Sequence, residues 1–297
     1  MSYRKRTRIK RLPASYLARI ARQALKEDIG RKDITTELSI PRDRFIRAVM
    51  LAKEEFIVCG LPLAESVFIE MDKDVRFNSF VQDGQLVGKG KILARLEGRA
   101  CSILTAERVA LNFLSLLSGT ATQTRRYVDA IKPYRARIID TRKTIPGLRE
   151  VQKYAVRVGG GLNHRMRLDE MVLIKDNHIK VMGNRSWVVD FKKIRSKISA
   201  QTKIEVEVRD LNEFKQALEA RPDIIMLDNM NIKDIKKAVQ IRNRLTPNTH
   251  DLTPKLEASG GITLKNVLRV ASCGVDMISV GSLTHSVKSV DISLEVI

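Results

Sequence analysis

The chain has 297 residues, 43% of them hydrophobic, which is enough for one large or two ordinary domains with a buried core. Its net charge of +20 favours anionic ligands, yet one Trp, five Tyr and the lack of a recognition motif argue against specific nucleic-acid binding. No apolar run approaches the roughly 20 residues of a membrane span, and the basic N-terminus is no secretory signal. Three scattered cysteines predict a reducing, cytoplasmic setting, and four histidines without paired cysteines argue against zinc.

The first hundred residues predict a mixed α/β domain. Residues 14–28 have the period of an amphipathic helix, and residues 33–36 are expected to form a polar loop. Residues 47–58 alternate like a strand, and a short helix is expected over residues 63–71. Glycine-punctuated short strands follow between residues 75 and 102, and we interpret them as a structural sheet.

A long helix is predicted over residues 105–131, with Thr105 as its N-cap. Arg108 then falls in the first turn, where a cation opposes the helix dipole. This unfavourable placement suggests a functional role for Arg108, and a solvent-exposed arginine is the equally good alternative.

After Pro133 the sequence becomes a repeated β/α unit. Six apolar runs alternate with helical stretches, and they read RIID, MVLIK, KIEVEV, DIIMLD, PKLEAS and DMISVG. This alternation is typical of a parallel barrel with its chemistry at the carboxyl ends of the strands. A full barrel has eight such units, so we expect a smaller or irregular one.

Cationic side chains gather at the ends of the first two apolar runs and in the loop between them. They are Arg142, Lys143, His164, Arg165 and Lys175. Because guanidinium groups bind carboxylates through paired hydrogen bonds, a dicarboxylate or a phosphate is the expected ligand. Ordinary solvated loops are the alternative interpretation, which the number of cations weakens.

Two acids, Glu207 and Asp228, stand at the ends of otherwise apolar runs. Hard oxygen ligands of this kind suit Mg²⁺, which proteins hold with one or two carboxylates and substrate phosphates. The alternative is that both acids form structural salt bridges with nearby cations.

Glycines follow the last two runs, in Ser259-Gly260-Gly261 and Gly281-Ser282. Such turns leave backbone N–H groups able to face a phosphate. No nucleophile–base pair, GxSxG turn or Walker loop is present, so covalent catalysis and nucleotide hydrolysis are excluded. Electrostatic stabilisation of a phosphate-bearing leaving group remains.

From about Ala14 to the C-terminus the chain resembles the quinolinate phosphoribosyltransferase family. The blocks that show it are IIDTRKTIPGLREVQKYAV, GGGLNHR, MVLIKDNHI, EVEV, IMLDN, ASGGI and VGSLTHS. The resemblance implies an α/β fold, with an open α/β sandwich over residues 1–117, which residues 286–297 rejoin, and an irregular, incomplete parallel α/β barrel over residues 118–285. It implies phosphoribosyl transfer from 5-phosphoribosyl-1-pyrophosphate to quinolinate, with release of pyrophosphate and CO₂, giving nicotinate mononucleotide for NAD synthesis.

The same resemblance implies residue roles on the quinolinate side. The carboxylates of quinolinate would be bound by Arg142, His164 and Arg165. Arg108 would reach this site from the neighbouring subunit of a homodimer or higher even oligomer, which gives its position a reason. Arg167 stands where glycine is expected, and we include it among the substrate-binding residues because it adds charge beside the site.

On the donor side, the resemblance implies four catalytic residues, Lys143, Lys175, Glu207 and Asp228. The lysines would face the donor and its pyrophosphate, and the two acids would hold Mg²⁺ and the ribose hydroxyls. The 5′-phosphate would lie against Ser259, Gly260, Gly261 and Gly281, and Ser282 completes the substrate-binding set.

Two alternatives remain. One is a related phosphoribosyltransferase for another pyridine or a pyrimidine, although a monocarboxylate needs fewer cations than this chain provides. The other is a basic nucleic-acid-binding protein on a degenerate barrel, which would have no need of Glu207 and Asp228.

Overall fold

The computed structural model describes residues 11–182, 187–245 and 253–297, which fold into two compact units. The first unit contains the described residues up to Arg125 together with Glu150–Gly160 and Ser286–Ile297. The second contains Arg126–Arg149 and Gly161–His285. The basic N-terminal arm lies largely outside the described residues.

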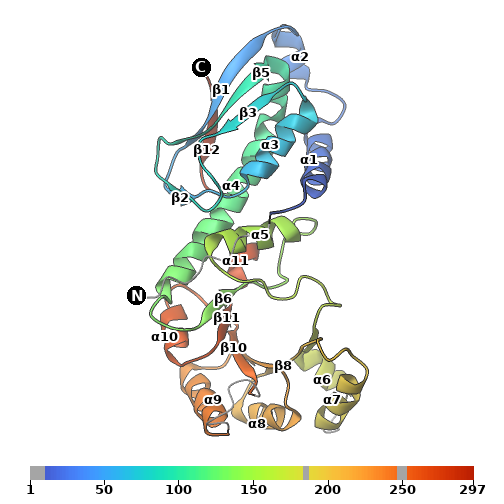
Figure 1. Ribbon diagram of the computed structural model, residues 1–297, viewed down its shortest axis with the longest axis vertical. Coiled ribbons are helices and arrows are strands. Elements are labelled where there is room, and N and C mark those ends of the chain that lie inside the picture. The colour runs from blue at the N-terminus through green and yellow to red at the C-terminus, as the bar shows by residue number, and fades with distance from the viewer. Residues whose placement is uncertain (1–10, 183–186, 246–252) are drawn as a thin grey trace. The chain divides into compact units, whose positions relative to one another are not determined.

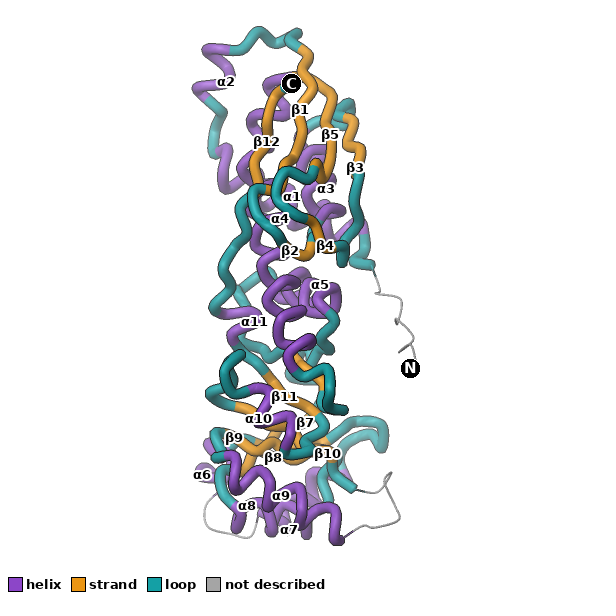
Figure 2. The backbone as a smooth tube through the Cα atoms, turned by 90° about the vertical axis from the view of Figure 1, so that its left-hand side faces the viewer, coloured by secondary structure: helices purple, strands orange, loops and turns teal. Residues whose placement is uncertain are grey.

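The first unit is built on an antiparallel sheet with the strand order β12-β1-β5-β3, whose strands lie side by side in Figure 2. Its strands are β1 (Phe45–Ala52), β3 (Arg76–Ser79), β5 (Ile92–Arg99) and β12 (Ile292–Val296), and β2 (Phe56–Ile57) pairs separately with β4 (Leu86–Val87). The predicted helix at residues 14–28 is confirmed as α1 (Ala14–Ile29), which buries one apolar face and packs on α3 (Leu61–Met71).

The loop expected at residues 33–36 was a wrong prediction, because these residues begin the short helix α2 (Ile34–Ser39). Asp33 is its N-cap, and the Asp33 carboxylate accepts hydrogen bonds from the backbone N–H and the hydroxyl of Thr36. The same contacts hold the pKa of Asp33 below its usual range. A capping aspartate and a polar loop share one composition, so the pattern alone did not separate them.

The long helix α4 (Ala100–Ala130) begins earlier than predicted, because β5 passes into it at Arg99 without a loop. Thr105 is therefore no N-cap, and its hydroxyl donates instead to Asp33 at 2.9 Å. Arg108 lies in the third turn, so the argument from an opposing helix dipole was wrong. In length and hydropathy α4 is apolar enough to span a membrane, but 56% of its most apolar stretch is buried in the protein, as in a core helix.

All six predicted barrel strands are present in the second unit. They are β6 (Arg137–Ile139), β7 (Val172–Ile174), β8 (Ile204–Val208), β9 (Ile224–Asp228), β10 (Lys255–Ser259) and β11 (Met277–Ser279). They form one parallel sheet in the order β6-β11-β10-β9-β8-β7. Because β6 and β7 are its two edges, the barrel is not closed, which confirms the expected incomplete barrel.

Helices connect these strands, as Figure 1 shows. They are α5 (Arg149–Gly159), α6 (Asp176–Met182), α7 (Trp187–Ser196), α8 (Leu211–Ala220), α9 (Ile232–Leu245), α10 (Val267–Ser272) and α11 (Ser282–His285). Helix α8 shows why they form, since Asp210 caps its first turn and Phe214 is buried where α8 contacts β8 and β9. The connections leave every strand pointing the same way, so all six carboxyl ends share one edge.

Candidate functional site

The carboxyl edge of the six-stranded sheet brings together residues that are far apart in sequence. Asp228 and Ser259 are register partners on β9 and β10, and Glu207 on β8 lies opposite Met226 of β9. Since side chains alternate along a strand, Glu207 and Asp228 lie on one face of the sheet, while Val206 faces the other way. Three predicted donor-side positions therefore share one edge, and a fourth, Gly281, follows β11 at the same end.

Lys175 and Glu207 form an ion pair at this edge, with 3.1 Å between Nζ and Oε2. Glu207 is nearly buried and Lys175 is half exposed, so one side of the pair faces solvent. The structural salt bridge considered as an alternative from sequence is thus present for Glu207. It joins two of the predicted catalytic residues directly.

The acids Glu207 and Asp228 fit a hard divalent cation in chemistry and placement. Both supply carboxylate oxygens near the carboxyl ends of neighbouring strands. Oδ2 of Asp228 accepts a hydrogen bond of 2.8 Å from the Asn229 side chain, and only Oε2 of Glu207 is taken by Lys175. These contacts orient the two carboxylates and leave oxygens for a ligand.

The loop after Gly161 is fixed by Asp140, which is completely buried at the end of β6. One carboxylate oxygen accepts from the backbone N–H of His164 at 2.9 Å, and the other accepts from the Asn163 amide at 2.5 Å. A buried carboxylate with charge-assisted hydrogen bonds is a rigid anchor. The backbone that carries His164 and Arg165 is therefore held against β6.

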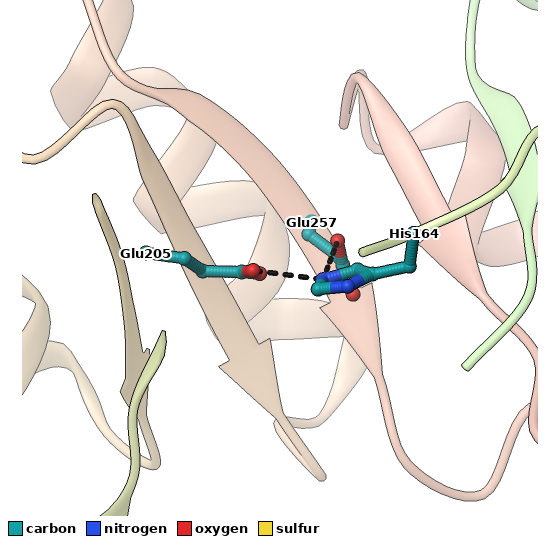
Figure 3. Close-up of side chains that lie close together, drawn as sticks. All are labelled: His164, Glu205 and Glu257. Atoms are coloured by element: carbon teal, nitrogen blue, oxygen red, sulfur yellow. Dashed lines mark hydrogen bonds and ion pairs between the residues drawn. The ribbon is translucent and has the colours of Figure 1, made fainter. Parts of the chain in front are cut away.

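Two glutamates from different strands approach the same nitrogen of the His164 imidazole, as Figure 3 shows. Nε2 is 2.8 Å from Oε2 of Glu205 on β8 and 3.8 Å from Oε2 of Glu257 on β10. Nδ1 accepts a hydrogen bond of 2.8 Å from the backbone N–H of Arg165. An accepting Nδ1 carries no proton, so the proton of the neutral ring is on Nε2, which donates to Glu205.

Glu205 and Glu257 are both 0% exposed. Burial raises the pKa of each carboxyl group above its usual range, and the nearby Glu205 raises the pKa of Glu257 further. Within the part of the chain that the structure describes, both oxygens of Glu257 and Oε1 of Glu205 have no hydrogen-bond partner of good geometry. Two such groups in a parallel strand core are costly, which points to a role beyond packing.

Arg142 and Arg165 are close enough to influence one another. Burial lowers the pKa of Arg165, the charge of Arg142 lowers it further, and Glu205 opposes both. Arg165 donates through Nη1 to the carbonyl of Met171 at 2.7 Å, while Nε of Arg142 is buried without a partner among the described residues. A cluster of guanidinium groups held this close is suited to a ligand with more than one negative charge.

A cavity of about 530 Å³ lies beside Arg165, with a lining that includes His164 together with Met171 and Lys203, which directly precede β7 and β8. Its volume lies in the range of small-molecule sites. Arg167 is exposed on the same loop and does not line the cavity.

Two glycines at the carboxyl edge allow close approach of neighbouring groups. Gly260 has φ +84°, and a Cβ there would lie 2.3 Å from Oδ1 of Asn229. A Cβ on Gly281 would lie 3.4 Å from Cδ of Lys143, so this turn packs on a predicted catalytic lysine. The Lys143 carbonyl accepts from the Thr284 hydroxyl at 2.7 Å, and Oγ of Ser282 is a buried group without a partner in the described chain.

Arg108 belongs to the first unit, where it is exposed on α4 and forms no ion pair with any described residue.

The site residues of the second unit that sequence reasoning missed are Glu205 and Glu257. A signal for both was available, because acids inside buried parallel strands are uncommon and Glu205 shares its face with Glu207.

An open parallel α/β barrel with acids and glycine turns at its carboxyl edge, and with an arginine-lined cavity, is typical of an enzyme that acts on a small anionic substrate. The family model for the C-terminal domain of quinolinate phosphoribosyl transferase matches residues 120–295, and that for the N-terminal domain matches residues 33–118. The chain belongs to the quinolinate phosphoribosyltransferase family.

Similar proteins agree in both sequence and fold. The probable nicotinate-nucleotide pyrophosphorylase [carboxylating] of Methanocaldococcus jannaschii is 44% identical over 284 residues, which cover 95% of this chain and 98% of that protein. The chloroplastic enzyme of the same name from Arabidopsis thaliana is 40% identical over 301 residues, covering 96% and 84%. The structure of the nicotinate-nucleotide pyrophosphorylase from Francisella tularensis superposes with a TM-score of 0.87 at 40% identity, covering 98% of this chain and 99% of that one.

Proposed function

We propose that this protein transfers phosphoribose from 5-phosphoribosyl-1-pyrophosphate to the ring nitrogen of quinolinate and releases pyrophosphate and CO₂. The product is nicotinate mononucleotide, a precursor of NAD. The observation that supports this most strongly is the pairing of two sites on one barrel. Arg165, whose pKa is lowered by burial and by the charge of Arg142, lines a cavity of small-molecule size, and the Lys175–Glu207 pair lies with Asp228 and Ser259 at the carboxyl edge of the sheet.

In this proposal the quinolinate carboxylates bind to Arg142 and Arg165. His164, which the resemblance also implies as a carboxylate ligand, lies beside them, with Nε2 donating to Glu205 and Nδ1 accepting from the Arg165 N–H. Each arginine can offer two parallel N–H groups to one carboxylate, which fixes the plane of the pyridine ring. The buried Nε of Arg142 without a partner in the described structure is a donor suited to such a ligand. Arg167 adds positive charge on the same loop and contributes to attraction of the diacid.

The phosphoribosyl donor binds along the carboxyl edge. Lys143 and Lys175 face its phosphates, and the turns at Ser259, Gly260, Gly261, Gly281 and Ser282 receive the 5′-phosphate. Glu207 and Asp228 would hold Mg²⁺ with the donor, and the ion would supply positive charge to the departing pyrophosphate. The same two acids can accept hydrogen bonds from the ribose hydroxyls.

The chemistry requires mainly orientation and charge. As pyrophosphate leaves, positive charge develops on the ribose and negative charge on the leaving group. The lysines stabilise the leaving group, and the carboxylates stabilise the ribose. The pyridine nitrogen attached to ribose is then cationic and stabilises the carbanion left at the adjacent ring carbon when CO₂ departs. That carbon takes a proton from water, which gives nicotinate mononucleotide. The side chains position the two reactants for this sequence without a covalent enzyme intermediate.

Arg108 completes the site from a neighbouring copy in this proposal, which makes the protein a homodimer or a higher even oligomer. Its exposed guanidinium without an ion-pair partner among the described residues is available for that role. The three free cysteines accord with a reducing, cytoplasmic setting.

The test is to incubate purified protein with quinolinate, 5-phosphoribosyl-1-pyrophosphate and Mg²⁺ and to quantify the products. The proposal predicts nicotinate mononucleotide and CO₂ in equal amounts, and no mononucleotide when nicotinate replaces quinolinate. Turnover of nicotinate or a pyrimidine in preference to quinolinate would instead favour a related phosphoribosyltransferase. Salt-sensitive binding to arbitrary duplex DNA with no turnover would favour the nucleic-acid-binding alternative.

A further inference from the structure

Glu205 and Glu257 are two buried acids to which the proposed reaction gives no task. They lie on β8 and β10, strands whose other interior positions are mostly apolar. Replacing a valine or isoleucine at such a position with an acid costs free energy unless the carboxyl group binds something. Their common partner is the His164 ring, which both approach within 3.8 Å.

His164 is fixed from three directions. Asp140 holds its backbone N–H at 2.9 Å, Glu205 holds Nε2 at 2.8 Å, and the backbone N–H of Arg165 donates to Nδ1 at 2.8 Å. The Glu205 contact determines the rotation of the ring, because it ties one ring edge to β8. The Arg165 contact then links the orientation of the ring to the backbone that carries the Arg165 guanidinium.

We propose that Glu205, supported by Glu257, is a positioning residue for quinolinate binding: it fixes the imidazole of His164 and through it the backbone of Arg165. This inference rests on the proposed function. Glu257 approaches the same ring nitrogen from β10, with 3.8 Å between its Oε2 and Nε2 of His164. The two glutamates act through His164 and do not touch the substrate.

We call the contact of Glu205 with the His164 ring the brace. It matters because recognition of a carboxylate by paired hydrogen bonds tolerates little displacement. A shift of about 1 Å in a guanidinium group is enough to lose paired hydrogen bonds and to slow a reaction substantially. We therefore expect loss of Glu205 to affect quinolinate more than the donor, because Glu205 is hydrogen-bonded to His164 and not to the groups that face the phosphates. This separation distinguishes a positioning role from a general loss of stability.

Steady-state kinetics of two Glu205 variants test the brace. Glu205→Leu has similar size but no acceptor, and we expect its quinolinate KM to rise at least about tenfold, with the donor KM within about twofold of wild type. Glu205→Gln keeps an acceptor oxygen for Nε2–H and should restore the quinolinate KM to within about threefold. Val206→Ala, on the same strand with its buried side chain on the opposite face, should lower Tm and leave the quinolinate KM unchanged.

Several outcomes would overturn the brace while leaving the proposed function intact. These are an unchanged quinolinate KM in Glu205→Leu, an equal rise of both KM values, or a Gln variant as impaired as the Leu variant. Inactive wild-type protein would instead contradict the proposed function itself.

A measurement on folded wild-type protein keeps the inference testable if Glu205→Leu fails to fold. With ¹⁵N-histidine labelling of the four histidines, the Nε2–H of His164 should give a slowly exchanging proton signal. Its assignment follows from its loss in His164→Gln, and the signal should persist in Glu205→Gln. Absence of any protected ring N–H in wild type would contradict the brace.

Metal analysis tests the competing role, since one donor atom from each of His164, Glu205 and Glu257 lies within 4.8 Å of the others. Stoichiometric metal in the purified protein that is lost in Glu257→Gln would make these residues ligands and overturn the inference. The brace predicts no retained metal at this cluster.

Discussion

At the scale of single residues, the arginine cluster is the feature that selects a diacid. Arg142→Ala removes a guanidinium group whose Nε is buried without a described partner, so it should abolish paired hydrogen bonds to one carboxylate. We expect quinolinate affinity, measured by calorimetry, to fall by more than about tenfold, or about 1.4 kcal/mol. Arg22→Ala removes an exposed arginine of the first unit and should have no effect. Equal affinities of wild type and Arg142→Ala would contradict the binding mode.

The turn at Gly260 makes a second prediction at this scale. Gly260→Ala places a Cβ 2.3 Å from Asn229 in a backbone with φ +84°, so the turn and the neighbouring Asp228–Asn229 contact must shift. The donor KM should rise at least about tenfold while the quinolinate KM changes little. Gly261→Ala also stands at a positive φ, +59°, but its Cβ meets no atom within 4 Å, so its loss should be smaller. The reverse order of the two variants would remove this turn from the donor site.

At the scale of elements, the two buried glutamates on β8 and β10 make stability depend on pH. Burial raises the pKa of Glu257 above the value of about 4.3 that it has in the unfolded chain. Above that pH the folded state keeps a proton that the unfolded chain releases, so the free energy of unfolding decreases as pH rises.

Glu257→Gln removes this proton and should flatten the curve. As the pH rises from about 5 to about 8, the Tm of wild type should fall by at least about 2 °C more than the Tm of the variant. Thermal scans across this range provide the measurement, with Glu219→Gln on the surface of α8 as a control that follows wild type. A wild-type curve parallel to that of Glu257→Gln would show that Glu257 carries no such proton.

The elements were largely predictable, and the reasons are physical. Each barrel strand is a short apolar run, and all six runs were read correctly because a parallel sheet buries both faces. Helix α2 and the start of α4 were missed, since Asp33 can form either a loop or a cap, and β5 passes directly into α4. Glu205 was not predicted as a site residue, because it is the second residue of β8 and the sequence argument considered only acids near the carboxyl ends of strands.

At the scale of the whole molecule, the family resemblance supplied the expected reaction and the residue roles, which local sequence patterns could not supply. The order of strands in the sheet and the meeting of His164 with Glu257 depend on contacts between distant segments, which periodicity does not encode. The β/α repeat and the family motifs both predicted the barrel, and the structure adds which side chains touch. The roles of individual site residues remain predictions that the variants above address.

The proposed shared site makes a prediction about assembly. If Arg108 completes the site of a neighbouring subunit, Arg108→Ala and Arg142→Ala should each lose most activity as pure proteins. Mixing them under subunit exchange should restore about a quarter of wild-type activity, since half of random dimers then hold one intact site. Size-exclusion chromatography should show a dimer or larger even oligomer. Mixtures that stay inactive despite proven exchange would place Arg108 outside the neighbour's site.

The central claim is that one barrel binds an aromatic diacid at Arg142 and Arg165 and a sugar phosphate at its carboxyl edge. A crystal structure of the protein with quinolinate and a non-reactive analogue of the donor tests it most directly. The account predicts quinolinate carboxylates at hydrogen-bond distance from Arg142 and Arg165, with the 5′-phosphate against Gly260 and Gly281. Quinolinate bound away from both arginines, or a donor analogue bound away from the carboxyl edge, would contradict the account.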